Sequence, residues 1–194
     1  MKQMRMVLVG ILCVGLVVGF YYYLSNRTTD SVQDTQEISE ITKITTKNLD
    51  TSYPATPREV IKFYNRILTC VYNEEYTDEE FDAMAEQIWK MMDADLQENN
   101  PLDLYRETLR ADVASYQAEN RIIATTSVCD SSDVDYRKVQ GYECAYVTAS
   151  YFLQSDTAFN RVNQEFVLRQ DSTEKWKIYG FAVIGGSDGN AEEQ

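Results

Sequence analysis

An uncharged run of 19 residues, from Met6 to Leu24, constrains this chain more than any other feature of its sequence. At the helical rise of about 1.5 Å per residue the run spans roughly 28 Å, which matches the hydrocarbon thickness of a bilayer. Lys2 and Arg5 precede it, and aromatic rings, which favour the headgroup region, close it. The sequence therefore predicts a transmembrane helix over residues 6–24, with these membrane-interface residues: Phe20, Tyr21, Tyr22 and Tyr23.

The flanks of this run favour an uncleaved signal anchor over two alternatives. A cleaved signal peptide would show small residues before the cut, and a cut after Gly19 would expose an aromatic terminus. A lipoprotein would need a small residue before Cys13, where Leu12 stands. Because positive charge stays on the cytoplasmic side, we expect a single-pass protein of the cell membrane, with residues 1–5 in the cytoplasm and everything after the span extracytoplasmic.

The part after the span is strongly acidic. All 31 Asp and Glu lie beyond residue 27, together with 15 of the 18 Lys and Arg, which gives this part a net charge of −16. Like charge disfavours nucleic acid and anionic lipid as partners. We interpret the charge as a solubilising surface; a cationic partner, such as Ca²⁺ or a basic polymer, is the alternative.

Composition divides the extracytoplasmic part into a juxtamembrane tether over residues 25–52, a folded domain over 53–184 and a disordered tail over 185–194. Within the tether, three isoleucines have the spacing of a short helix that packs on the domain: Ile38, Ile41 and Ile44.

Three helices are predicted in the first half of the domain. The first two begin at capping boxes, Thr56 with Glu59 and Thr77 with Glu80, and the third follows Pro101. The chain then changes to the two-residue period of strands. Four strands with short linkers are predicted at residues 121–129, 142–153, 162–170 and 176–184. The expected fold class is α+β: three helices packed on a curved, four-stranded antiparallel sheet, forming a cone with an apolar interior.

This order of elements resembles the nuclear transport factor 2-like superfamily, also called the SnoaL-like or cystatin-like cone. Four phrases are also similar to an uncharacterised family of small, membrane-anchored proteins of Gram-positive gut bacteria: Tyr53–Val60, Phe63–Arg66, Tyr72–Tyr76 and Trp176–Ile178. The superfamily includes isomerases, hydratases, transport adaptors and accessory domains, so the resemblance implies a fold without choosing an activity.

The chain contains no histidine. This excludes Ser-His-Asp and Cys-His nucleophile systems, the H-E-x-x-H zinc site and histidine-ligated haem or copper. The acidic loop Asp130–Asp135 lacks the spacing, glycine and terminal Glu of a calcium loop. We therefore predict no catalytic constellation, no metal site and no cofactor.

Carboxylates and tyrosines are the acid–base groups that remain. A site like that of ketosteroid isomerase needs a carboxylate base and a buried donor, often Tyr, inside an apolar cavity. The side chains that could reach such a cavity are the ligand-pocket candidates Tyr64, Trp89, Tyr105 and Tyr146. The structural alternative is that these rings form core edges with solvated hydroxyls.

Cys70, Cys129 and Cys144 follow the span, and Cys13 lies within it. If residues 121–129 and 142–153 form a hairpin, Cys129 and Cys144 flank its loop, and a disulfide between them is one hypothesis. The other is that all three are buried thiols.

Two functions remain open. The leading hypothesis is a membrane-tethered binding or accessory domain without catalytic activity. The alternative is a small-molecule isomerase or lyase that uses Tyr and a carboxylate in the cone. A cavity with an isolated carboxylate beside a Tyr would favour the alternative, and a filled interior the first. A homodimer through the outer sheet face, at Tyr146, Thr148, Ser150 and Phe152, is a further expectation.

The anchor yields a direct prediction. In bacterial cells that express the full chain, the protein should enter the membrane fraction, require detergent for extraction and lose its domain to protease added outside intact cells. Recovery of the chain from cytosol without detergent, with its initiating methionine, would contradict the predicted topology.

Overall fold

The computed structural model describes residues 38–185, which contain five α-helices and a five-stranded antiparallel sheet. The helices are α2 (Glu40–Thr45), α3 (Pro57–Asn73), α4 (Asp78–Met91), α5 (Ala94–Asn99) and α6 (Leu102–Ala118). The strands are β1 (Ile122–Val128), β2 (Asp135–Val139), β3 (Tyr142–Gln154), β4 (Phe159–Gln170) and β5 (Trp176–Val183). The α+β class is confirmed. α3, α4 and α6 are the three predicted helices, α2 corresponds to the short helix expected from the isoleucine spacing, and α5 and β2 were not predicted.

Both predicted capping boxes are present. The Thr56 hydroxyl accepts from the Glu59 backbone N–H while the Glu59 carboxylate accepts from the Thr56 N–H, and Thr77 and Glu80 do the same for α4. Each box satisfies N–H groups that have no partner inside the helix. The sequence thus determines where these two helices begin.

The sheet has the order β1-β3-β4-β5. The short strand β2 pairs with the same edge of β3 as β1 does, further along the strand. β1 lies opposite the second half of β3 and β2 opposite its first half. Residues 130–141 were predicted as a linker between two strands, and β2 corrects this prediction. All five residues of β2 are exposed, so no alternation of apolar and polar residues marks the strand. It forms because Gln140 and Gly141, both with positive φ, make a tight hairpin turn into β3.

The position of β2 also rules out the disulfide hypothesis. The Cys129 N–H donates to the Thr148 carbonyl, whereas Cys144 lies opposite Arg137 of β2. Thr148 and Cys144 are four residues apart on one strand, about 13 Å, and a disulfide needs Cα atoms within about 7 Å. Cys70, Cys129 and Cys144 are free thiols.

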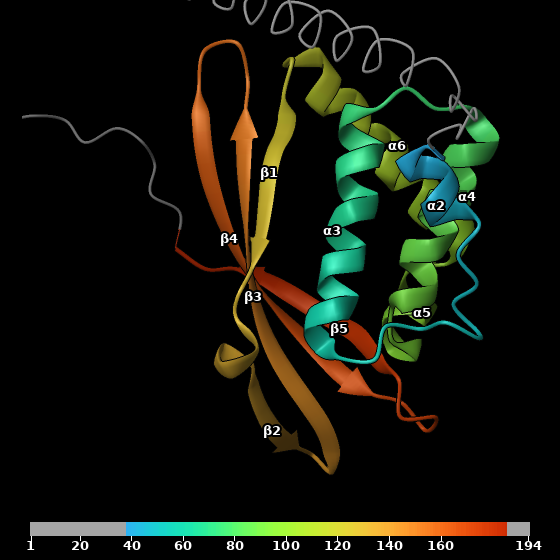
Figure 1. Ribbon diagram of the computed structural model, residues 1–194, viewed down its shortest axis with the longest axis vertical. Helices are drawn as coiled ribbons and strands as arrows, with labels where there is room; N and C mark the ends of the chain where they lie inside the picture. The colour runs from blue at the N-terminus through green and yellow to red at the C-terminus, as the bar shows by residue number, and fades with distance from the viewer. Residues whose placement is uncertain (1–37, 186–194) are drawn as a thin grey trace, which may run out of the picture. The chain divides into compact units, whose positions relative to one another are not determined.

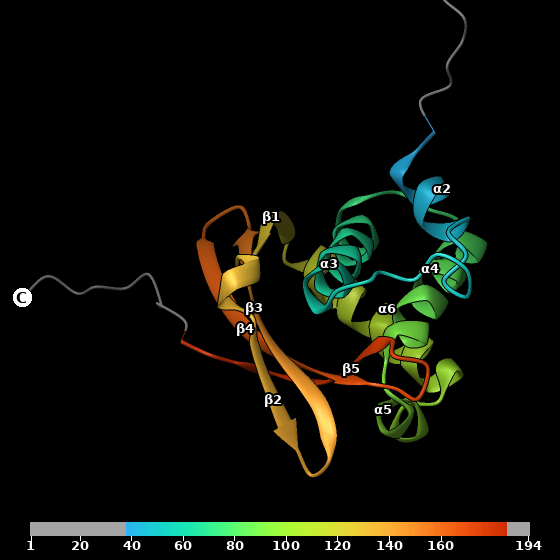
Figure 2. The same cartoon turned by 60° about the horizontal axis from the view of Figure 1, so that its bottom comes forward.

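The helices lie on one side of the sheet (Figures 1 and 2). α3 runs beside the free edge of β1 and is attached to it near both ends. The Asn73 side chain exchanges two hydrogen bonds with the backbone of Ile123, at 2.8 and 2.9 Å, and the Arg58 Nε donates to the Cys129 carbonyl at 2.6 Å. The opposite edge strand, β5, accepts a hydrogen bond at Ile178 from the Asp93 N–H, at 2.8 Å. Both sheet edges are therefore tied to the helical layer.

Part of the predicted tether belongs to the core. Ile41, Ile44 and Leu49 are buried, α2 packs on α4, and the Gln87 side chain donates to the carbonyls of Ile44 and Lys47. The apolar spacing noted in the sequence therefore marks a real helix, although Ile38 is exposed. The packed structure begins before the predicted domain start at residue 53.

Several predictions fall outside the described residues: the span over 6–24 with its interface aromatics, the tether up to residue 37 and the tail after residue 185. Within residues 38–185, no helix combines the length and apolarity needed to cross a membrane.

The packing of α2 is testable by mutation. Ile44→Ala removes a fully buried side chain and should lower the free energy of unfolding by about 2–4 kcal/mol. Lys43→Ala, an exposed neighbour on the same helix, should change it by less than about 0.5 kcal/mol. Urea unfolding followed by the fluorescence of Trp89 and Trp176 measures both. Equal stabilities for the two variants would mean that residues 39–52 form a tether after all.

Candidate functional site

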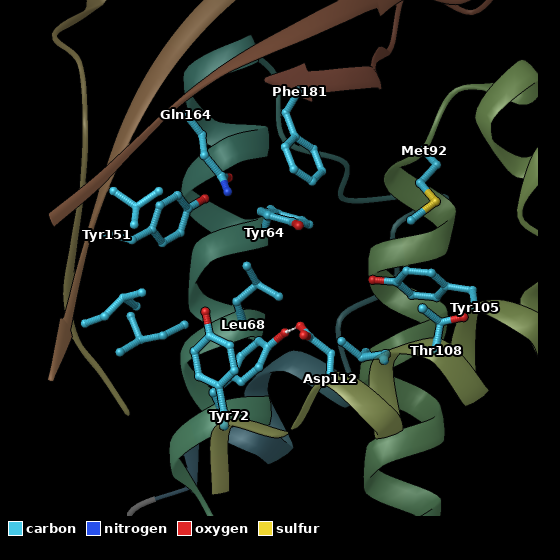
Figure 3. A pocket seen from close by; sticks show the side chains of 15 residues that line it. Tyr64, Leu68, Tyr72, Met92, Tyr105, Thr108, Asp112, Tyr151, Gln164 and Phe181 are labelled. Atoms are coloured by element: carbon cyan, nitrogen blue, oxygen red, sulfur yellow. Dashed lines mark hydrogen bonds between the residues drawn. The ribbon is translucent and has the colours of Figure 1, made fainter. Parts of the chain in front are cut away.

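A cavity of about 400 Å³ lies between the helices and the inner face of the sheet (Figure 3). Its wall is mostly apolar and contains five tyrosines, one carboxylate, and no Lys or Arg. The lining residues are Tyr64, Leu68 and Tyr72 of α3; Met92, which follows α4; Tyr105, Thr108, Leu109, Asp112 and Tyr116 of α6; Ile123 of β1; Tyr151 and Leu153 of β3; Val162 and Gln164 of β4; and Phe181 of β5.

Regular spacing brings these side chains together. On α3 the lining residues recur every four positions, and on α6 they recur at three- and four-residue steps, so each helix presents one stripe to the cavity. On the strands they alternate, and cross-strand partners such as Tyr151 with Val162 lie on the same inner face.

Tyr64 and Tyr105 extend into the cavity from opposite helices. In Figure 3 their hydroxyl oxygens lie on the sides of the rings that face each other. The Tyr64 ring is held edge-on by Phe166, with ring centroids 5.5 Å apart and planes at 68°. Burial raises the pKa of both phenols far above its ordinary value. Both are therefore neutral hydrogen-bond donors at physiological pH.

Tyr72 and Asp112 form a hydrogen-bonded pair at the rim, in which the phenol donates to the carboxylate Oδ2 (Figure 3). Tyr116 packs on Tyr72 with ring centroids 4.5 Å apart. Asp112 is exposed to solvent. Burial, and then the hydrogen bond to Asp112, raises the pKa of Tyr72. The single charged side chain of the wall therefore lies where the cavity meets water.

Tyr151 is held in place by a hydrogen bond to Asn65, a buried residue that does not line the cavity. Its hydroxyl donates to the Asn65 Oδ1 at 2.6 Å, and Asn65 is 2% exposed. The Asn65 amide nitrogen has no hydrogen-bond partner in the described part of the chain. This bond fixes the Tyr151 ring in the wall and occupies its hydroxyl proton.

Two of the four predicted pocket residues line the cavity, namely Tyr64 and Tyr105. Trp89 lies elsewhere and donates its indole N–H to the Asn100 carbonyl at 2.9 Å. Tyr146 is on the outer face of β3, where the Arg137 guanidinium carbon lies 4.5 Å from its ring centroid. Tyr72, Asp112, Tyr116 and Tyr151 were not predicted as cavity residues. The apolar stripe along the third predicted helix contained Tyr116 and the alternation along β3 contained Tyr151, whereas no apolar pattern marked Asp112.

The buried phenols predict a decline of stability in alkali. Because burial holds the pKa of Tyr64, Tyr105 and Tyr151 above the unfolded value of about 10, their contribution to stability is complete below pH 10 and is lost as the pH rises above it. Each should lower the free energy of unfolding by up to about 1.4 kcal/mol per pH unit. Urea unfolding between pH 8 and 11 should show this, with a smaller slope in Tyr151→Phe than in the exposed control Tyr136→Phe. Equal slopes for these two variants would contradict it.

No curated protein matches this chain. A family model described as a domain of unknown function (DUF6715) matches residues 1–181. The match covers nearly the whole sequence and agrees with the expected resemblance to an uncharacterised family. The chain therefore belongs to the family of proteins that share this domain of unknown function.

Proposed function

We propose that this domain binds a small, uncharged and mainly apolar molecule in the cavity between α3, α6 and the sheet. The observation that carries the proposal is an apolar cavity of about 400 Å³ whose single charged group lies at its rim. Sites for small ligands in proteins have this size and composition.

The wall supplies two kinds of contact. Aliphatic and aromatic side chains, such as Leu68, Leu153 and Phe181, would exclude water from a ligand and so provide most of the binding free energy. The phenols add a few oriented donors, which is the usual source of specificity in an otherwise apolar site.

Charge selects against anions. The wall contains one carboxylate and no cation, so an anionic ligand would lose its hydration without gaining an opposite charge. Asp112 at the rim would also repel it. A neutral ligand loses no charge hydration on entering the cavity and is not repelled by Asp112.

The same proposal places the domain at the outer face of the cell membrane, in a nuclear transport factor 2-like arrangement. The uncharged run over residues 6–24 and its basic flank support this location. The helices on one face of an antiparallel sheet, with a cavity between them, support the fold.

A small-molecule isomerase or lyase is the second candidate, and one observation favours it. Asp112, a lone carboxylate beside Tyr72, lies at a cavity that also holds neutral phenols, which is the combination such a site needs. Solvent exposure of Asp112 and its bond to Tyr72 favour the binding module instead, because the carboxylate faces water and already accepts a hydrogen bond from the protein.

Binding is testable with a neutral probe. The full chain in lipid nanodiscs should give a saturable rise in the fluorescence of N-phenyl-1-naphthylamine, after subtraction of empty nanodiscs. Thr108→Phe places a ring in the cavity and should weaken binding about tenfold. Ala111→Phe, an exposed position on the same helix, should leave it unchanged. Equal responses from the two variants would contradict the proposal.

The same sample distinguishes the second candidate. With 2-acetylnaphthalene in D₂O, a binding module leaves the exchange of the methyl protons at the background rate seen by NMR. Exchange that the chain accelerates and Asp112→Asn abolishes would identify an enzyme instead.

A further inference from the structure

Two of the five cavity tyrosines already donate their hydroxyl proton in a hydrogen bond to another residue. Tyr72 donates to Asp112, and Tyr151 donates to Asn65. Tyr116 lies at the rim, where the Arg121 guanidinium carbon is 5.1 Å from its ring centroid. Tyr64 and Tyr105 differ from Tyr72 and Tyr151, because their hydroxyls make no hydrogen bond with any residue between 38 and 185. They differ from Tyr116 in position, because they lie inside the cavity and Tyr116 lies at its rim.

These two hydroxyls are not sealed in the core. The buried side-chain polar atoms without a partner in the described part of the chain belong to Asn65, Gln87 and Arg106. Since the Tyr64 and Tyr105 oxygens also lack a partner but are absent from this set, they are open to the space in the cavity. They project from α3 and α6 toward that shared space (Figure 3).

From this we infer that the cavity holds a ligand with an uncharged acceptor oxygen, such as a ketone, aldehyde or ester carbonyl, between the hydroxyls of Tyr64 and Tyr105. The inference rests on the proposed function and specifies its ligand class. A carbonyl oxygen has two lone pairs and so accepts one hydrogen bond from each phenol.

The chemistry of the wall narrows the class. Burial keeps both phenols protonated, so they act as donors to an acceptor atom. A ligand without such an atom would leave two donors desolvated and unpaired, which is the usual basis for rejecting an analogue that lacks a polar group. An ionised carboxylate would bring a charge into a wall without a cation.

Three probes with one ring system test the inference on the full chain in nanodiscs: 2-acetylnaphthalene, 2-ethylnaphthalene and 2-naphthoate. Calorimetric titration should show the acetyl compound binding about tenfold more tightly than the ethyl compound, because two hydrogen bonds are made. The naphthoate should bind at least about tenfold more weakly than the acetyl compound, and Asp112→Asn should recover part of that loss.

Phenylalanine variants assign the effect to particular hydroxyls. Tyr64→Phe and Tyr105→Phe should each reduce the acetyl-over-ethyl preference about threefold, and the double variant should abolish it. The matched control is Tyr136→Phe, which removes the hydroxyl of an exposed tyrosine on β2 outside the cavity and should keep the preference. Unfolding midpoints of all variants confirm that the comparison is made on folded protein.

The outcomes separate this inference from the proposal beneath it. Equal binding of the acetyl and ethyl compounds would overturn the acceptor site and leave the apolar binding module standing. A preference that survives in the Tyr64→Phe, Tyr105→Phe double variant would overturn the assignment to these hydroxyls. Failure of all three probes and of N-phenyl-1-naphthylamine to bind would overturn both.

Discussion

The attachment of both sheet edges to the helical layer is the constraint on which the site depends. The Asn73 side chain forms hydrogen bonds with the backbone of Ile123 on the edge strand β1. The Asp93 N–H donates to the Ile178 carbonyl on the edge strand β5. Arg169 strengthens the second attachment by pairing with Asp93, which is 4% exposed. These bonds satisfy strand groups that would otherwise be open for pairing with another chain. They hold α3 against β1, and they hold the junction between α4 and α5 against β5.

The sequence decides which part of the space between the helices and the sheet is filled. In the middle of the sheet, Val147 pairs with Phe166 and both are fully buried, with the small residue Ala145 beside them. Further along β3, the inner face carries Tyr151 and Leu153, opposite Val162 and Asn160. β3 has 13 residues, about 43 Å, whereas the 17 residues of α3 span about 26 Å. The helix covers only part of the strand. Its contacts from Arg58 to Cys129 and from Asn73 to Ile123 place it beside the half of β3 that pairs with β1. This half carries Tyr151 and Leu153, and together with α3 it forms the cavity wall.

The same residues show which parts of the fold and of the cavity could be predicted from the sequence alone. Capping boxes and apolar stripes depend on local chemistry, so the starts of α3 and α4 and the inward positions of Tyr64 and Tyr105 were predictable. β2 was not, because its five exposed residues carry no apolar period and only the turn at Gly141 reveals it. The alternation along β3 assigns Tyr146 to the face opposite Val147, so this candidate was wrong on the sequence's own periodicity. Trp89 follows the apolar stripe of α4, whose partners are chiefly other helices, so only the tertiary packing excludes it from the cavity.

The choice between binding and catalysis depends on where the one carboxylate lies. A carboxylate inside the cavity would face a bound ligand directly, whereas one at the rim faces water. Asp112 is exposed and already accepts the Tyr72 proton, so the hydrogen bond is used to fix the rim. The phenols deeper in the wall are neutral donors without partners in residues 38–185. Such a wall orients a polar atom of a ligand through neutral donors, while its one carboxylate lies at the rim. This arrangement is the reason that we propose recognition rather than turnover.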